Sequence, residues 1–189
     1  MNIRLLNADE IECRVAQVSK SQYGVSCSLL LYKDARCDMS ILDEVYGKTN
    51  WKREHVIIDG RLYCNVSVWD AEKGQWVVKQ DVGTESNTEK EKGQASDSFK
   101  RACTNWGIGR ELYTAPMIWV RLRDKEYSEQ NGRIKCKQSF RVRSIQYDKR
   151  RISGIVIEDE KGEARFELVP PPVELTEVQK KAKRVKQLL

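Results

Sequence analysis

The sequence predicts an α+β fold with a β-β-β-α core over about residues 25–113, in which a helix lies across an antiparallel sheet. Two observations predict it. Polar and apolar residues alternate around the pair Asp59-Gly60, which is a strong signal for a tight turn between antiparallel strands. Residues 92–106 instead carry apolar side chains at helical spacing and are followed by Gly107, a residue type that commonly ends helices.

Three elements are expected before the first hairpin. Asn7 and Glu10 have the spacing of a helix cap, which predicts a short first helix over about residues 8–20. Residues 25–32 alternate and then become apolar, which predicts a strand. Asp38 is expected to cap a second helix.

Three strands and the long helix complete the core. Strands are expected on both sides of Asp59-Gly60, and a looser turn over residues 72–74 leads to a third strand over residues 76–82. Thr88 and Glu91 have capping-box spacing at the start of the long helix.

The remainder of the chain predicts additional C-terminal strands and a terminal helix. The first strand alternates apolar residues with four cations, namely Lys135, Lys137, Arg141 and Arg143. Strands over residues 152–157 and 165–169 follow, and three prolines then precede a basic helical tail. We therefore divide the chain into a domain over residues 1–172 and a tail over residues 173–189. The cationic strand face has two open interpretations, a track for phosphates or a charged edge that discourages aggregation.

Composition indicates a cytoplasmic protein with a polyanionic partner. The 189 residues are 40% hydrophobic, with a net charge of +6 and a pI near 9.0. A net positive charge favours a polyanionic partner but does not identify it. No apolar run approaches the ~20 residues of a membrane span, and the N-terminal segment carries charge too early for a signal peptide.

The sequence contains few of the residue patterns that are typical of catalytic or metal-binding sites. The six cysteines form no CxxC pair and His55 is the only histidine, so we expect no metal, no cofactor and no disulfide. The chain has neither a GxSxG motif nor a phosphate-binding P-loop. A metal-dependent nuclease would use carboxylates such as Asp59, Asp70, Asp81 and Glu85, but the first two stand in turn-forming stretches. We expect a protein that is not an enzyme.

The strongest functional signal is a pair of cations on the long helix. Ala95, Phe99, Ala102, Cys103 and Trp106 form one apolar arc. Arg101 points away from this arc and Lys100 lies on its flank. The pair has two interpretations, contact with nucleic acid or ordinary helix-surface ion pairs with Asp97.

The same run resembles the Rad-fifty-two/Rad-twenty-two single-strand annealing family, including its phage members. The likeness rests on Lys92-Gly93, on Ala95-Ser96-Asp97, on Phe99-Lys100-Arg101-Ala102 and on the turn at residues 107–110. It extends upstream through Asp81-Val82-Gly83 and residues 45–51, so it covers roughly residues 29–113 in the family's order.

The resemblance implies a set of DNA-binding residues. Lys100 and Arg101 fall on the family's two groove cations, and Tyr32 falls on its groove aromatic. Thr104 stands where a further cation is expected, and Lys20 is a nearby candidate for an arginine ahead of the first strand. The remaining candidates are Lys33, Lys92 and Arg110, with the strand cations Lys135, Lys137, Arg141 and Arg143 as a secondary set. Tyr63, Trp69 and Trp76 either stack on bases or simply pack the sheet.

The expected function is ATP-independent binding of single-stranded DNA and annealing of complementary strands in recombination and double-strand break repair. The resemblance implies a homo-oligomeric ring or helix, encoded by a phage or prophage in a bacterial cell. A protector protein that covers single strands without annealing them is the alternative, and a nuclease is a weaker one. The tail over residues 173–189 has two interpretations, a solvated end or a segment that docks on a neighbouring subunit, DNA or a host single-strand-binding protein.

Overall fold

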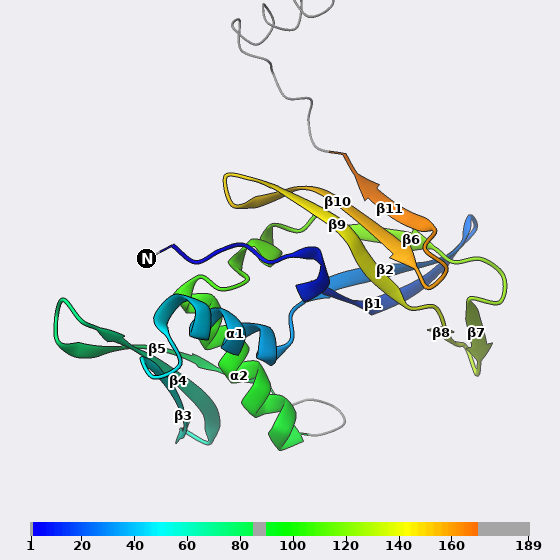
Figure 1. Cartoon of the computed structure of the whole chain (residues 1–189). Coiled ribbons are helices and arrows are strands. Elements are labelled where there is room, and N and C mark those ends of the chain that lie inside the picture. The colour runs from blue at the N-terminus through cyan, green and yellow to red at the C-terminus, as the bar shows by residue number, and fades with distance from the viewer. Residues whose placement is uncertain (1, 85–89, 170–189) are drawn as a thin grey trace, which may run out of the picture.

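The computed structural model describes residues 2–84 and 90–169 (Figure 1). Within these residues the helical elements are the α-helices α1 (Ala35–Tyr46) and α2 (Lys90–Trp106) and the short 3-10 helices η1 (Ala8–Glu10) and η2 (Arg110–Thr114). The strands are β1 (Glu12–Ser21), β2 (Gly24–Tyr32), β3 (Trp51–Ile58), β4 (Arg61–Asp70), β5 (Gln75–Val82), β6 (Ile118–Arg121), β7 (Tyr127–Gln130), β8 (Arg133–Cys136), β9 (Phe140–Asp148), β10 (Arg151–Asp159) and β11 (Ala164–Leu168).

The three-stranded sheet carries α2 on one face, as the sequence predicts. Its order is β3-β4-β5, and both pairings are antiparallel. The turn at Asp59 and Gly60 has φ angles of 49° and 72°, which two-residue hairpins require. Trp106 of α2 donates its indole N–H to the carbonyl of Val66 on β4 at 3.0 Å. The α+β class with antiparallel sheets is therefore confirmed.

Gly83 allows the chain to leave β5 directly against α2. A Cβ atom at this position would lie 2.2 Å from the carbonyl oxygen of Gln94 and 2.7 Å from the backbone nitrogen of Ser98. Such distances are far below van der Waals contact, so only glycine fits here. The small residue thus fixes how closely the sheet approaches the helix that carries Lys100 and Arg101.

A six-stranded antiparallel sheet forms the other side of the molecule, in the order β11-β10-β9-β1-β2-β6 (Figure 1). Its two edge strands lie close together, as shown by the hydrogen bond that Arg165 on β11 donates to the carbonyl of Arg121 on β6 at 2.8 Å. One face is buried, with Cys27, Leu29 and Val120 almost fully removed from solvent. This face joins the residues beneath α1 and α2 in a single apolar core.

The first predicted helix is wrong beyond its first turn. Asn7 and Glu10 do form a capping box, but the helix they begin is η1, which ends at Glu10. The following residues form β1, whose pairing with β2 slips between Val15 and Gln17. This bulge interrupts the two-residue period that would have indicated a strand.

Two other predicted elements are corrected. The second helix begins four residues earlier than expected, because its N-cap is Asp34 and not Asp38; Asp34 accepts from the N–H of Arg36. Asp38 lies inside α1 and is fully buried. The predicted cationic strand is two strands, since β8 pairs with β7 in a separate sheet and β9 belongs to the six-stranded sheet. Thr88 and the tail over residues 173–189 lie outside the described residues.

Candidate nucleic-acid interface

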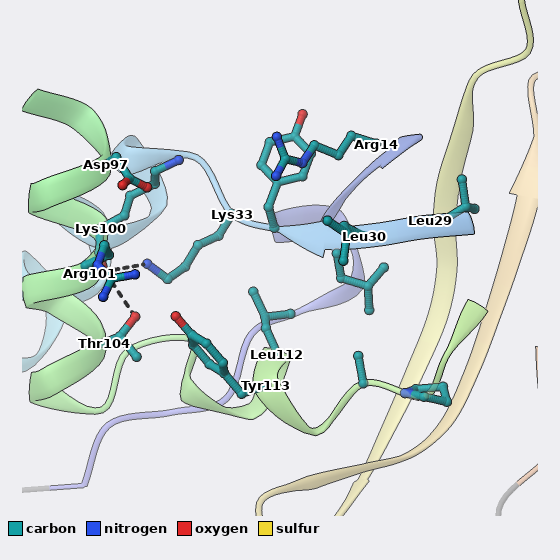
Figure 2. Close-up of a pocket in the computed structure, with 15 residues that line it drawn as sticks. Arg14, Leu29, Leu30, Lys33, Asp97, Lys100, Arg101, Thr104, Leu112 and Tyr113 are labelled. Carbon is teal, nitrogen blue, oxygen red and sulfur yellow. Dashed lines mark hydrogen bonds between the residues drawn. The ribbon is translucent and has the colours of Figure 1, made fainter. Parts of the chain in front are cut away.

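A groove of about 690 Å³ opens between α2, the C-terminal end of β2 and η2 (Figure 2). Its walls combine cationic, aromatic and aliphatic side chains. The lining residues are Arg14, Leu29, Leu30, Leu31, Tyr32, Lys33, Asp97, Lys100, Arg101, Thr104, Gly109, Leu112, Tyr113, Ala115 and Pro116. The groove therefore contains four of the residues predicted to bind DNA, namely Tyr32, Lys33, Lys100 and Arg101.

The α2 wall presents Lys100 and Arg101 from a firmly packed helix. Phe99, next to them in the chain, is fully buried and holds the opposite side of α2 in the core. Arg101 donates to Asp81 at 3.2 Å while its side chain stays 45% exposed. Within residues 2–84 and 90–169, Lys100 forms no ion pair. Arg101 is thus held in place by one carboxylate, and the ammonium group of Lys100 is available to a ligand.

Asp97 does not form the ion pairs that the helix spacing offered. Its carboxylate accepts from the backbone N–H of Thr84 at 2.9 Å and from the Thr84 hydroxyl at 3.1 Å. No ion pair in the described chain joins it to Lys100 or Arg101. Asp97 therefore ties the end of the β5 segment to α2, and the interpretation of the two cations as its partners is wrong.

The opposite wall comes from the β1–β2 hairpin. Tyr32 donates its hydroxyl to Glu12 at 2.5 Å, and this hydrogen bond is the main reason that the pKa of Tyr32 rises to about 12. Arg14 pairs across the strands with Leu30, so both side chains lie on the exposed face of the hairpin. Arg14 has no ion pair within the described residues.

Arg14 was missed because residues 8–20 were expected to form a helix. The signal that would have found it is the alternation of the polar residues Glu12 and Arg14 with Cys13 and Val15, which is typical of a half-buried strand. The pairing with Leu30 brings this cation to the groove, and no local property of the sequence indicates that neighbour.

Lys33 lies at the base of the groove in a different role from the exposed cations. Only 5% of it is exposed, and its ammonium group donates to the buried carboxylate of Asp38. Its Nζ atom also lies 3.5 Å from the carbonyl oxygen of Lys100. Gly109, with a φ of 66°, makes room for this side chain, since a Cβ there would lie 2.3 Å from Cε of Lys33. Lys33 therefore links β2, α1 and α2.

Three other predicted contacts lie around or away from the groove. Arg110 donates to the carbonyl of Thr104 at 3.2 and 3.0 Å and so caps the C-terminal end of α2. Lys92 is exposed eight residues before Lys100, about 12 Å away along the helix axis. Lys20 forms an ion pair with Glu129 at 2.8 Å. It lies six residues beyond Arg14 on β1, roughly 20 Å along the strand, so the structure does not bring it to the groove.

The secondary basic set does not form one continuous row. Arg141 and Arg143 on β9 both bind the carboxylate of Glu158, and their hydrogen bonds hold the pKa of Glu158 below its usual value. Lys135 lies on β8 in the two-stranded sheet, and Lys137 follows that strand. Half of this set is therefore engaged in ion pairs, which agrees better with a charged strand surface than with a phosphate track.

The other aromatic candidates lie on the three-stranded sheet. Trp69 and Trp76 pack edge to face with ring centroids 5.5 Å apart, and the ammonium group of Lys52 lies 4.6 Å from the ring centre of Trp76. Tyr63 is on the same strand as Trp69. Tyr113 was not among the candidates, although it lines the groove and is 74% exposed. In the sequence, the only feature that pointed to Tyr113 was its position after the glycine-containing turn at residues 107–110.

Two of the carboxylates that a nuclease would need, Asp59 and Asp70, are used in turns of the fold, and Glu85 lies outside the described residues. Asp59 has a positive φ of 49° in the β3–β4 turn, and Asp70 accepts two backbone N–H groups at 3.1 Å in the turn that follows β4. In the described part of the chain, no group of three or more histidine, cysteine, aspartate or glutamate side chains is placed to hold a metal ion.

No family model, curated protein or solved structure matches this chain. Among the described residues, no helix is both long enough and apolar enough to cross a membrane.

Proposed function

We propose that this protein binds single-stranded DNA in the groove and anneals complementary strands without ATP. The observation that carries the proposal is the pair of cations on opposite walls, Lys100 from α2 and Arg14 from β1, neither of which has an ion pair within the described residues. Arg101 adds a third positive charge beside them. Cations without internal partners in an open groove favour a polyanionic ligand.

The chemistry of the walls favours single strands. Phosphates bind to the cations of the groove, while Tyr32 and the exposed ring of Tyr113 offer apolar surface to bases. Such a site neutralises charge and extends the strand, which removes the main barrier to pairing with a complement. It needs no covalent step and no cofactor. The resemblance to the single-strand annealing family supports the same proposal.

Assembly into a homo-oligomer, a ring or a helix, belongs to this proposal. One groove holds only a few phosphates, so a single subunit would bind weakly at physiological salt. Adjacent grooves on a common track would raise the local concentration of sites and so the total affinity. The proposal also includes a role in recombination and repair in a phage-infected or lysogenic bacterial cell. A host single-strand-binding protein would be a partner in this role.

An annealing assay tests the function directly. Two complementary fluorescent oligonucleotides are mixed with and without the protein in the absence of ATP, in one series without divalent metal and in a second series with Mg²⁺. We expect the protein to accelerate duplex formation and to leave both strands intact. Binding without acceleration would assign the protein to the class of protectors, and metal-dependent shortening of the labelled strands would indicate a nuclease.

A further inference from the structure

Tyr113 presents an aromatic ring to the groove from a rigid backbone. It lies in η2, and its residue is 74% exposed although it lines the groove. Figure 2 shows its ring extending from η2 toward Thr104 on α2. Within the described residues, the ring and hydroxyl of Tyr113 form no hydrogen bond or ring contact. The side chain is therefore available to a ligand.

The backbone on both sides of Tyr113 is fixed by buried contacts. The carboxylate of Glu111 is buried and accepts from the N–H of Leu6 at 2.8 Å. The hydroxyl of Thr114 donates to the carbonyl of Glu111 at 2.7 Å and accepts from the N–H of Ile152 at 2.9 Å. The fold thus holds this turn in one conformation, so the backbone at Tyr113 loses little conformational entropy when the ring binds a ligand.

The groove around the ring indicates which ligand it fits. Lys100 and Arg101 supply positive charge on α2, and Tyr113 supplies an apolar face on η2 (Figure 2). A nucleotide presents the same combination, a phosphate and a flat base. In a duplex the faces of the bases are stacked on one another, so only an unpaired base can stack on this ring. Tyr32 is less suited to this role, because it is half-buried and bound to Glu12.

We propose that Tyr113 stacks on an unpaired base of the strand whose phosphates contact Lys100 and Arg101, and that this contact makes the groove prefer single strands over duplex. The proposal rests on the proposed function, because it assumes that the groove binds DNA. It adds a specificity-determining residue: the cations attract any polyanion, and the ring distinguishes strands that have free base faces.

The test compares an oligo-dT strand with an abasic strand of the same length, which has the same phosphates and no bases. We expect Tyr113→Ala to weaken binding of oligo-dT by about 5- to 100-fold. Its affinity for the abasic strand, and the dependence of that affinity on salt, should equal those of the parent. Tyr113→Phe should bind oligo-dT like the parent, since stacking needs the ring and not the hydroxyl. Tyr23→Ala is the matched control, because Tyr23 is also 74% exposed but lies in the β1–β2 turn.

The other possible results would contradict either the stacking contact or the proposed function. Equal loss on both strands would mean that Tyr113 shapes the groove or contacts the backbone, and failure of Tyr113→Phe would mean that its hydroxyl forms the contact. Parent-like binding of oligo-dT by Tyr113→Ala would exclude stacking while the proposed function stands. Failure of the parent protein to bind either strand would contradict the proposed function itself.

Discussion

The ammonium group of Lys33 at the end of β2 donates to the carboxylate of Asp38 on α1, and both side chains are buried beneath the groove. The second oxygen of this carboxylate has no hydrogen-bond partner in the described structure. The Nζ atom of Lys33 also lies 3.5 Å from the carbonyl oxygen of Lys100 on α2. This ion pair therefore holds together the elements that position the groove cations.

Removing one partner of this pair should be strongly destabilising. We expect Lys33→Met to lower the free energy of unfolding by about 3–5 kcal/mol, because it leaves the Asp38 carboxylate buried without its cation. Urea unfolding measures the change. The double variant Lys33→Met/Asp38→Leu should recover most of it, since it removes both charges. Equal loss in the single and double variants would show that packing, and not charge, dominates at this site.

The pair also predicts an unusual dependence of stability on pH. Burial raises the pKa of Asp38 to about 6 in the folded protein, from an ordinary value of 3.8. Between these values the folded state binds more protons at this carboxyl than the unfolded state does. The contribution of Asp38 to the unfolding free energy should therefore increase as the pH falls from about 7 through 6 toward 4.

Carboxylates with a lowered pKa affect the unfolding free energy in the opposite direction and over a different pH range. Hydrogen bonds from Arg4 lower the pKa of Glu10, and those from Arg165 lower the pKa of Glu126, so the stability they contribute is lost only as the pH falls below about 4.5. A carboxyl-carbon NMR titration should give Asp38 a midpoint near 6. A midpoint near 4 would contradict the assigned burial.

Gly109 should be harder to replace than a glycine in open space. A Cβ at Gly109 would lie 2.3 Å from Cε of Lys33, whereas a Cβ at Gly60 meets no atom within 4 Å. Both residues have positive φ angles, 66° and 72°, so the backbone cost of alanine is similar. We expect Gly109→Ala to lower the unfolding free energy by about 1–3 kcal/mol more than Gly60→Ala. Equal costs in urea unfolding would show that Lys33 moves aside freely.

Assembly should not depend on DNA. We expect light scattering at micromolar protein to give a mass that is a multiple of 21.9 kDa without any added nucleic acid. The Lys100→Ala/Arg101→Ala variant should have the same mass, because these cations line the groove. A single monomeric mass would exclude the oligomeric part of the proposal.

Local patterns explain which parts of the fold were predictable. The β3–β4 turn and α2 were found because a tight turn and a helical repeat are encoded by adjacent residues. The β1 strand was missed because a bulge breaks its period. The site was predictable only in part. Lys100 and Arg101 can be recognised from the helical pattern of α2, but Arg14 and Tyr113 reach the groove only through tertiary packing. The burial of Asp38 likewise depends on its contact with Lys33.

The salt dependence of single-strand binding shows whether the groove is the DNA-binding site. The parent is compared with Lys100→Ala/Arg101→Ala and with Lys125→Asn/Lys149→Asn. The second variant also removes two charges, from exposed turns outside the groove, and asparagine suits the positive φ angles of both residues, 77° and 46°. We expect the groove variant to bind more weakly, to anneal more slowly and to reduce the slope of log affinity against log salt by about 0.7 per charge removed. The turn variant should behave like the parent. If the groove variant instead keeps the affinity and slope of the parent, the groove is not the DNA site, and the basic residues from Lys135 to Arg143 become the next place to test.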